Sequence, residues 1–248
     1  MPVSSNGTKT YHLATATVSR LGFGAMQLPG PGVFGPPRDR DAAIAVLRRA
    51  AELGVNHIDT AQYYGPGVAN ELIREALYPY PPDLALVSKV GARRDKSGGV
   101  LRYDQPTQLR EGIEDNLRSL DVGHLAAVNL RLMDDAEPCV QNPLNLADRR
   151  SMPVLEECNA RGIAFVPFCP LGSAFAAGNP VLGDARVTAI AARLGHTPAQ
   201  IALTWLLGLR PNVLLIPGTS SIAHLEENMA VANIELDAEA RELLAPKA

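Results

Sequence analysis

Short apolar segments alternate with amphipathic, helix-like segments along the chain, and this alternation limits the fold more than any other feature. The strand-like segments are residues 21–26, 55–59, 84–89, 124–130, 163–167 and 213–216. The helix-like segments are residues 41–53, 68–77, 106–120, 152–161, 187–194, 198–209, 222–230 and 238–244. Such alternation is typical of parallel βαβ units, and so many units favour a barrel or a doubly wound sheet. No GxGxxG motif follows the first strand, which favours the barrel.

Length and charge narrow the class of protein further. The chain has 248 residues, of which 46% are hydrophobic and 20% charged, with a formal net charge of −3. One α/β barrel fills this length, so a single domain over residues 1–248 is expected. The small net charge argues against nucleic acid or an anionic membrane as the main partner. Neither a membrane span nor a signal peptide is recognisable, so a cytoplasmic location is expected.

The cysteines and histidines show no spacing that is typical of a metal site or a disulfide framework. Cys139, Cys158 and Cys169 are far apart and form no CxxC pair, so free thiols in a reducing compartment are expected. The five histidines have no ligand spacing, and we expect no metal. By strand alternation His57 shares a face with Asp59, which predicts a buried core histidine.

Three polar side chains lie at or just after the ends of consecutive strands. Asp59 ends one strand, Tyr64 follows in the loop Asp-Thr-Ala-Gln-Tyr-Tyr-Gly, and Lys89 ends the next strand. In a parallel barrel these strand ends meet at one rim, where active sites lie. A lysine paired with a carboxylate can stabilise a tyrosinate, which makes Tyr64 a candidate proton donor to a carbonyl oxygen that receives a hydride at its carbon. A structural Asp–Lys pair capped by a tyrosine is the alternative that this pattern leaves open.

Five blocks in this order resemble the active-site and cofactor blocks of aldo-keto reductases. They are residues 54–65 (GVNHIDTAQYYG), 86–91 (LVSKVG), 140–149 (VQNPLNLADR), 165–172 (FVPFCPLG) and 215–228 (LIPGTSSIAHLEEN). Within the family, the chain is most similar to the bacterial branch that includes pyridoxal reductases. The resemblance implies a TIM-type (β/α)8 barrel, NADP(H) as cofactor, and reduction of the carbonyl group of a small aldehyde or ketone.

The resemblance also assigns catalytic roles. Asp59, Tyr64 and Lys89 match the first three members of the family's catalytic tetrad, with Tyr64 as general acid, Lys89 as its cationic neighbour and Asp59 as the partner that orients the lysine. The fourth member is usually a histidine, but Asn129 occupies its position here. An asparagine can donate a hydrogen bond to a carbonyl oxygen but cannot shuttle a proton, so slower catalysis is expected.

A cofactor site follows from the same resemblance. The residues expected around the nicotinamide and its ribose are Gly24, Ala25, Met26, Gln141 and Phe168, and those over the pyrophosphate are Cys169, Pro170, Leu171 and Gly172. Gly218, Thr219 and Ser220 are expected to bind phosphate before a helix N-terminus. His224, Glu227 and Asn228 match positions around the adenosine 2′-phosphate and adenine. Taken alone, this last stretch also fits an ordinary turn and a capped helix. NADP is expected rather than NAD only because members of the family usually bind NADP.

One departure from the family pattern affects the fold. Family members carry a helix, a strand and a second helix between the strand of Asn129 and the Val-Gln-Asn block, whereas here only a short segment, Arg131–Pro138, precedes Cys139-Val-Gln. Loss of one α–β–α unit would leave an incomplete barrel of about seven parallel strands. It would also expose a strand edge and apolar surface, so an unusual homo-oligomer or marginal stability is expected.

Two functions therefore stay open. In the first, the chain reduces a small-molecule carbonyl substrate with NADP(H), either slowly or with a specialised substrate. In the second, it is a catalytically impaired cofactor-binding or scaffold protein, or a non-redox catalyst. Retention of Asp59, Tyr64 and Lys89 favours the first, whereas Asn129 and the missing unit favour the second.

Overall fold

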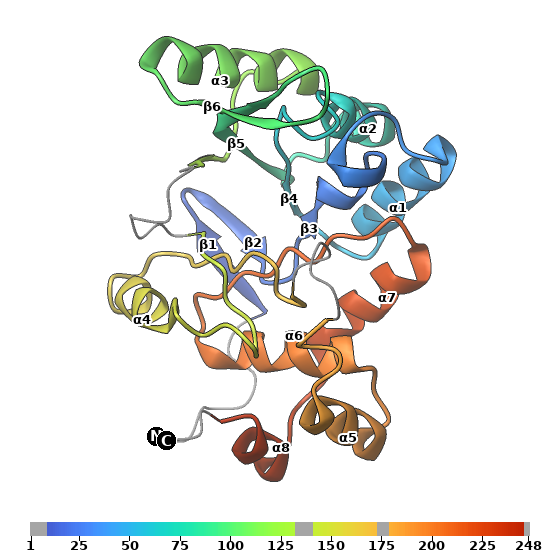
Figure 1. Cartoon of the computed structure of the whole chain (residues 1–248), viewed down its shortest axis with the longest axis vertical. Coiled ribbons are helices and arrows are strands. Elements are labelled where there is room, and N and C mark those ends of the chain that lie inside the picture. The colour runs from blue at the N-terminus through green and yellow to red at the C-terminus, as the bar shows by residue number, and fades with distance from the viewer. Residues whose placement is uncertain (1–8, 132–140, 173–178, 246–248) are drawn as a thin grey trace. The chain divides into compact units, whose positions relative to one another are not determined.

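The computed structural model describes residues 9–131, 141–172 and 179–245 (Figure 1). The strands are β1 (Thr10–Leu13), β2 (Ala16–Ser19), β3 (Phe23–Gly24), β4 (His57–Asp59), β5 (Ala85–Arg94), β6 (Val100–Tyr103) and β7 (Ala127–Leu130). The α-helices are α1 (Arg40–Glu52), α2 (Val68–Leu77), α3 (Pro106–Leu120), α4 (Met152–Ala160), α5 (Ala185–Leu194), α6 (Pro198–Leu209), α7 (Ile222–Ala230) and α8 (Ala238–Leu243). Short 3₁₀ turns are η1 (Ala25–Gln27), η2 (Pro31–Val33) and η3 (Val231–Asn233).

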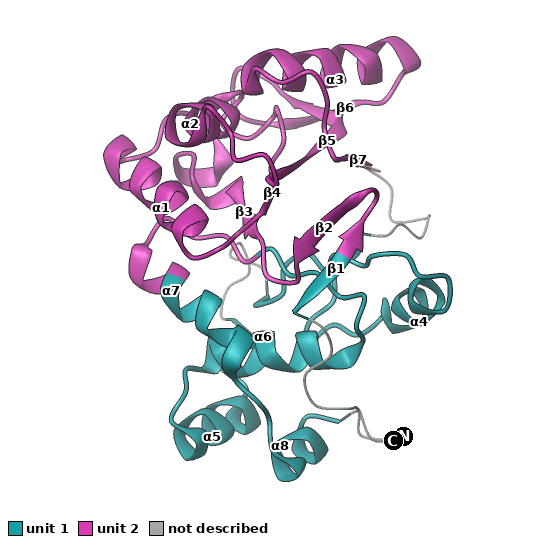
Figure 2. Ribbon diagram, turned by 180° about the vertical axis from the view of Figure 1, so that it is seen from behind, with its two compact units in different colours: residues 1–11, 138–216, 226–248 teal, residues 12–137, 217–225 magenta. Residues whose placement is uncertain are grey.

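Two compact units divide the chain (Figure 2). Unit 1 comprises residues 1–11, 138–216 and 226–248, and unit 2 comprises residues 12–137 and 217–225. In the described part of the chain no helix has the length and apolar character needed to cross a membrane.

The sheet of unit 2 contains β3, β4, β5 and β7 in parallel and β6 in antiparallel orientation to β5. Gly24 pairs with Asp59 and Asp59 with Val87, and Lys89 pairs with Asn129 on β7. Because parallel strands share one direction, the carboxyl ends of β3, β4 and β7 come to one edge of the sheet. The hairpin of β5 and β6 was not expected from the sequence, nor was the separate β1–β2 ribbon.

Helices α1, α2 and α3 flank this sheet (Figure 1). Neighbouring helices pack on one another, and α3 also packs on β5. Leu47 of α1 and Leu72 and Ile73 of α2 are fully buried, and each such side chain contributes about 1.5–3 kcal/mol relative to an exposed one. The bounds of α2, α3, α6 and α7 coincide with the helix ranges expected from the sequence.

In unit 1 the strands expected at residues 163–167 and 213–216 are reduced to isolated parallel bridges. One bridge joins Phe165 to Val213 and another joins Pro143 to Phe168. Two backbone hydrogen bonds form the first bridge. The Phe165 amide donates to Asn212 O and the Leu214 amide donates to Phe165 O, each at 2.9 Å. Prolines lack the amide donor that a longer ladder needs, and Pro167 and Pro217 follow these bridges closely.

Four further expected strand ranges are corrected. β4 begins at His57 and β7 at Ala127, later than expected. β5 continues to Arg94 because it pairs with β6, so Lys89 lies inside the strand and not at its end. The first expected strand, residues 21–26, shortens to β3 because the chain turns into η1 directly after Gly24. A candidate strand at residues 139–141 lies largely outside the described residues. Over residues 9–131, 141–172 and 179–245, the pairings form an α/β arrangement without a closed ring of strands.

Candidate active site

A buried ion pair lies near the point where the parallel pairing of β4, β5 and β7 ends, at Asp59 on β4 and at Val90 on β5. The Nζ of Lys89 donates to Oδ1 of Asp59, and it also donates to the carbonyl oxygen of Thr60 at 3.1 Å. Lys89 is 8% exposed and Asp59 4%. Burial by itself lowers the pKa of Lys89, but the Asp59 carboxylate and the phenols of Tyr64 and Tyr63 together outweigh burial and hold this pKa above its usual value. Lys89 therefore stays an ammonium at neutral pH.

Tyr64 lies directly beside this ammonium. The Nζ of Lys89 is 5.0 Å from the centre of the Tyr64 ring, and the Tyr64 side chain is buried. Its backbone is fixed by a turn in which the Tyr64 amide bonds Ala61 O at 3.0 Å and the Ala69 amide bonds Tyr64 O at 3.1 Å. The carboxylate, ammonium and phenol expected from the sequence thus come together in one place.

Asn129 reaches the same place from β7. It is the Cα partner of Lys89 in a parallel pair, so both side chains point to the same face of the sheet. Asn129 is half-buried, whereas the neighbouring residues of its strand, Val128 and Leu130, are exposed on the other face. An amide donor therefore stands next to the cation at this rim.

Tyr63 is a neighbour that the sequence did not single out. Its ring meets that of Tyr64 edge to face with centroids 5.3 Å apart. Burial raises the pKa of Tyr63 to about 12, so it stays a neutral phenol. Only its adjacency to Tyr64 in the sequence signals its presence.

His57 is a buried core histidine, as expected. It is 1% exposed, and burial lowers its pKa to about 4, so its imidazole stays neutral at pH 7. Gly22 makes room for the ring, because a Cβ on this glycine would lie 2.2 Å from Cε1 of His57.

Part of the expected cofactor set also lies in unit 2, against the end of β3. Gly218 approaches the backbone of Gly24 so closely that a Cβ on Gly218 would lie 2.3 Å from Gly24 O. Thr219 follows, buried, and its Oγ1 accepts from the Ser221 amide at 3.0 Å. Gly24, Ala25, Met26, Gly218, Thr219, Ser220 and His224 thus belong to the same unit as the ion pair. Ser220 and His224 are exposed there.

The remaining expected cofactor residues are gathered in unit 1. They are Gln141, Phe168, Cys169, Pro170, Leu171, Gly172, Glu227 and Asn228. Cys169 and Gly172 adopt left-handed backbone conformations, with φ of 51° and 84°. Phe168 is 41% exposed, and Asn228 is buried.

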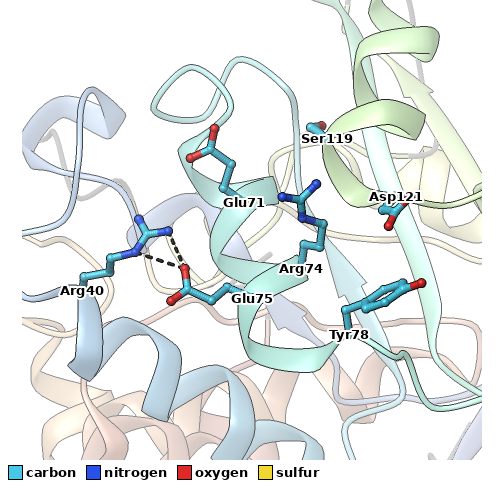
Figure 3. Close-up of a pocket in the computed structure, with 7 residues that line it drawn as sticks. All are labelled: Arg40, Glu71, Arg74, Glu75, Tyr78, Ser119 and Asp121. Carbon is cyan, nitrogen blue, oxygen red and sulfur yellow. Dashed lines mark hydrogen bonds and ion pairs between the residues drawn. The ribbon is translucent and has the colours of Figure 1, made fainter.

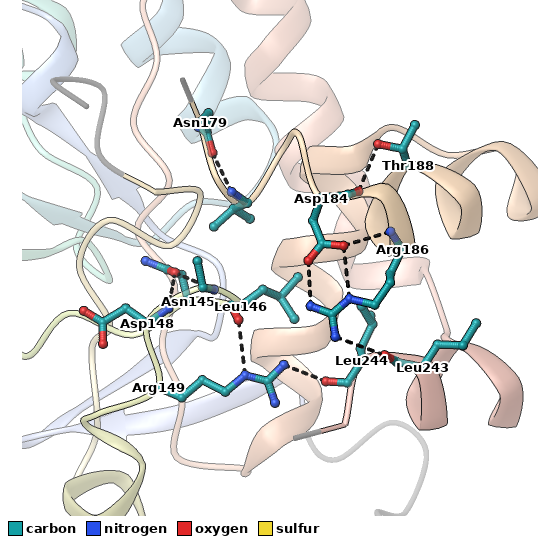
Figure 4. A network of polar contacts seen from close by, with 12 residues as sticks. Asn145, Leu146, Asp148, Arg149, Asn179, Asp184, Arg186, Thr188, Leu243 and Leu244 are labelled. Atoms are coloured by element: carbon teal, nitrogen blue, oxygen red, sulfur yellow. Dashed lines mark hydrogen bonds and ion pairs between the residues drawn. The ribbon is translucent and has the colours of Figure 1, made fainter. Parts of the chain in front are cut away.

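Two asparagines that the sequence did not single out hold this loop. Nδ2 of Asn145 donates to Cys169 O at 3.0 Å, and Nδ2 of Asn179 donates to Leu171 O at 2.7 Å. Asn145 also joins the polar network around Arg149 and Asp184 that Figure 4 shows. Cys158 and Cys169 are both free thiols. Burial raises the pKa of the Cys169 thiol. Cys139 lies outside the described residues.

A separate hollow of about 520 Å³ lies on the outer side of unit 2 (Figure 3). It is lined by Arg40, Glu71, Arg74, Glu75, Tyr78, Ser119 and Asp121. An exposed ion pair between Arg40 and Glu75 crosses it at 2.5 Å. Its lining comes mostly from helices α1, α2 and α3 and not from the strand ends, so it is a charged surface hollow apart from the candidate site. No group of three or more metal-ligating side chains occurs among the described residues.

Comparison with known proteins identifies the class of protein to which this α/β chain belongs. The profile of the aldo/keto reductase family matches residues 20–138 and 136–245, so the chain belongs to this family of oxidoreductases. It is similar to pyridoxine 4-dehydrogenase of Escherichia coli (strain K12), with 44% identity over 283 aligned positions that cover 96% of each chain. It is also 34% identical to an uncharacterized oxidoreductase of Schizosaccharomyces pombe, over 96% of this chain and 89% of that one.

A solved structure shows the fold. An aldo/keto reductase from Klebsiella pneumoniae, crystallised in complex with NADP and acetate, superposes with a TM-score of 0.76 at 22% identity, over 96% of this chain and 94% of that one. The chain therefore has the TIM-barrel type of fold of its family, with a difference in length. The alignment with the Escherichia coli relative runs over 283 positions, more than the 248 residues of this chain, so that relative carries residues that have no counterpart here. The two profile matches meet at residues 136–138, in the segment where the sequence pattern is shortened.

Proposed function

We propose that the protein is an NADP(H)-dependent reductase of small aldehydes or ketones, with Tyr64 as general acid. The observation that carries the proposal is the buried Lys89 ammonium, which is held by Asp59 and lies 5.0 Å from the centre of the Tyr64 ring. An ammonium fixed beside a phenol can stabilise the negative charge that develops on the phenol oxygen as its proton passes to a substrate. A purely structural ion pair would not require a phenol at this point.

The residues of this chain do three things in the reaction. Tyr64 gives its hydroxyl proton to the carbonyl oxygen of the substrate, and the phenolate that remains is stabilised by the ammonium of Lys89. Asp59 and the carbonyl oxygen of Thr60 keep that ammonium in place. Asn129, beside Lys89 on the same face, donates a hydrogen bond to the same substrate oxygen.

The backbone around Gly218 fits a dinucleotide. Its close approach to Gly24 admits no side chain and brings the Thr219–Ser220 turn, which precedes α7, to the end of β3. Backbone amides before a helix N-terminus suit a phosphate group. Within unit 2 we propose that Gly24, Ala25, Met26, Gly218, Thr219, Ser220 and His224 are NADP(H)-binding residues. For the unit 1 residues Gln141, Phe168–Gly172, Glu227 and Asn228 we propose the same role, and this part rests on the family resemblance of their sequence blocks alone. When bound, NADPH supplies the hydride.

We further propose that the chain is one domain with an incomplete barrel of about seven parallel strands. Four strands, β3, β4, β5 and β7, lie in one sheet, and three further parallel segments carry the bridges at Pro143, Phe165 and Val213. These seven segments support the proposal. The alignment with the longer relative is consistent with loss of one α–β–α unit near residues 136–138.

For the substrate we propose pyridoxal and related aromatic aldehydes, interconverted with their alcohols. The proposal depends on the 44% identity to the Escherichia coli pyridoxine 4-dehydrogenase over 96% of each chain. The alternative is a catalytically impaired, NADP-binding or scaffold protein on the same fold. Two observations favour that alternative: Asn129 replaces the usual histidine, and the missing stretch would carry residues that hold the carboxamide of the cofactor.

The proposal is tested by fluorescence titration with NADPH, followed by turnover of pyridoxal. We expect micromolar binding and steady turnover, with turnover reduced about 10²–10⁴-fold in Tyr64→Phe, the range typical for loss of a general acid. NADPH binding should remain in that variant, because the hydroxyl serves the substrate. Tyr63→Phe is the matched control and should retain turnover, since the pKa of Tyr63 is raised to about 12 and its phenol stays protonated.

Binding without turnover in the wild-type protein would favour the impaired, scaffold-type alternative. Absence of binding at millimolar NADPH would contradict both nicotinamide proposals together.

A further inference from the structure

A chain of buried side-chain hydrogen bonds lies behind the strand ends of unit 2 and leads to one asparagine, Asn116 of α3. Thr60, Asn70, Ser88 and Asn116 are all 0% exposed. We propose that Asn116 is a positioning residue, which fixes the three segments that carry Asp59, Tyr64 and Lys89 relative to one another. The inference rests on the proposed reductase function, for which these three side chains must act together.

The first connection runs to the strand of Lys89. Ser88 precedes Lys89 on β5 and points to the opposite face, toward α3. Its Oγ donates to Asn116 Oδ1 at 2.5 Å, and Asn116 Nδ2 lies 3.5 Å from the carbonyl oxygen of Lys89. The side chain before the catalytic lysine is thus held by this amide, and the lysine carbonyl lies at the outer limit of hydrogen-bond distance from it.

The second connection runs to the strand of Asp59 through α2. Asn70 Nδ2 donates to Asn116 Oδ1 at 2.9 Å, and Asn70 Oδ1 accepts from Thr60 Oγ1 at 2.8 Å. Thr60 directly follows Asp59, and its carbonyl oxygen accepts from Nζ of Lys89 at 3.1 Å. The network therefore holds a peptide group that itself orients the ammonium.

The third connection runs to the loop of Tyr64. Asn116 Nδ2 donates to Oε1 of Gln62 at 3.0 Å, and the carbonyl oxygen of Gln62 accepts from the Gly67 amide at 2.7 Å. Gly112 of α3 leaves space for this side chain, because a Cβ there would lie 3.1 Å from Nε2 of Gln62. Gln62 precedes Tyr64 by two residues, so the turn that presents the phenol is tied to the same amide.

One orientation of the Asn116 amide satisfies all of these contacts. Its oxygen accepts from Ser88 and Asn70, while its nitrogen faces the oxygens of Gln62, Lys89 and Gly112, the last at 2.8 Å. Asparagine is a weak helix former, and a buried amide costs free energy unless it is fully bonded. A site that breaks local preference in this way is expected where function requires it.

The direct test replaces Asn116 by alanine and measures kcat, KM and the pH profile for pyridoxal reduction by the full chain, together with NADPH affinity. We expect kcat to fall about tenfold or more, because small misplacement of catalytic groups reduces rates strongly. The pH at which the rate falls on the basic side should also move, while NADPH affinity stays within about twofold. Asn212→Ala is the matched control: Asn212 is equally buried, but it belongs to unit 1 and bonds Ile163 O at 2.8 Å.

A second pair of variants covers the case in which Asn116→Ala does not fold. Thr60→Val keeps the shape of the side chain but removes the donor to Asn70, whereas Thr60→Ser keeps the hydroxyl. We expect Thr60→Val to lower kcat and to move the pH profile in the same direction, and Thr60→Ser to restore both to within about threefold of the wild type.

Hydrogen exchange of residues 57–64 and 85–90 separates this inference from the proposed function. The backbone amides of both segments should exchange faster in Asn116→Ala than in the wild type. Their exchange rates should be unchanged in Asn212→Ala, and both results are expected whether or not the protein reduces pyridoxal. A wild-type protein without turnover would contradict the proposed function, while the exchange result would still decide the positioning role. A folded Asn116→Ala with wild-type kcat, pH profile and exchange would overturn the inference, as would an equal loss of kcat in Asn212→Ala.

Discussion

Two ionisable side chains on β4, His57 and Asp59, are buried two residues apart on one face of the strand, but their surroundings differ. Asp59 forms an ion pair with the ammonium of Lys89. His57 lies behind it against Gly22, and burial outweighs the attraction of the Asp59 carboxylate and lowers its pKa to about 4. The charged pair is thus confined to the end of β4, where a substrate oxygen would lie.

The lowered pKa of His57 predicts a pH dependence of stability. A neutral imidazole in the folded state and a usual pKa near 6.5 in the unfolded state mean that the unfolded chain binds more protons between pH 6.5 and 4. Stability from this group is therefore complete above pH 6.5 and lost as the pH falls toward 4, by about 2 kcal/mol at pH 5. Urea unfolding at pH 7 and pH 5 measures this loss.

His57→Asn is the control, because asparagine does not titrate. The difference in unfolding free energy between pH 7 and pH 5 should be smaller in this variant than in the wild type. An equal difference in both proteins would show that His57 is not the group responsible.

At the scale of elements, the sequence predicted helices better than strands, for local reasons. α2 and α3 begin and end where their apolar faces and end signals predict, and α3 starts with a proline in its first turn and a capping box between Gln105 and Gln108. β6 was missed because Val100–Tyr103 shows no alternation and pairs only through the turn that Asp95 forms by bonding the amides of Ser97 and Gly99. Strand pairing between segments that are distant in the chain is difficult to predict from a single sequence.

The same distinction applies to the site. Asp59, Tyr64 and Lys89 could be predicted because strand ends of a parallel fold meet at one edge. Asn116 could not, since its partners come from α2, β5 and the loop after β4, and its own helix pattern shows only an ordinary polar residue. Its burial becomes visible only once these elements are packed.

An arginine fixes the C-terminal helix within unit 1 (Figure 4). Arg149 donates through Nε to Leu146 O at 3.2 Å and through a terminal nitrogen to Leu244 O, at the end of α8, at 2.7 Å. Its guanidinium lies 4.7 Å from the ring of Trp205. Arg149→Lys should lower the free energy of unfolding by about 2 kcal/mol, because a lysine cannot make both hydrogen bonds while stacking on the ring.

Trp205 is the only tryptophan in the chain, so its emission during urea unfolding reports the change. Arg150→Lys is the matched control, since the Arg150 side chain is 83% exposed and its ion pair with Asp148 contributes little. Equal stability of Arg149→Lys and Arg150→Lys would contradict this role of Arg149.

At the scale of the whole molecule, β7 exposes two apolar side chains. Val128 is 39% exposed and Leu130 46%, on the face of the strand opposite Asn129. In the described part of the chain, β7 pairs with β5 alone. Apolar side chains on the open side of an edge strand favour association with another chain.

We therefore expect the protein to self-associate as its concentration rises, and the double variant Val128→Thr with Leu130→Thr to do so less. Sedimentation velocity over a range of concentrations measures the difference. Leu243→Gln is the control, because Leu243 is 45% exposed on α8, far along the chain from β7. A wild-type monomer at every concentration would contradict the expectation.

The central claim is that the phenol of Tyr64, beside the ammonium of Lys89, delivers the proton for carbonyl reduction. It is tested most directly by mixing the protein, loaded with NADPH, with excess pyridoxal and following the loss of NADPH absorbance in a single turnover. We predict a rapid single turnover in the wild type and a rate at least about 100-fold lower in Tyr64→Phe. Equal single-turnover rates in the two proteins would contradict it.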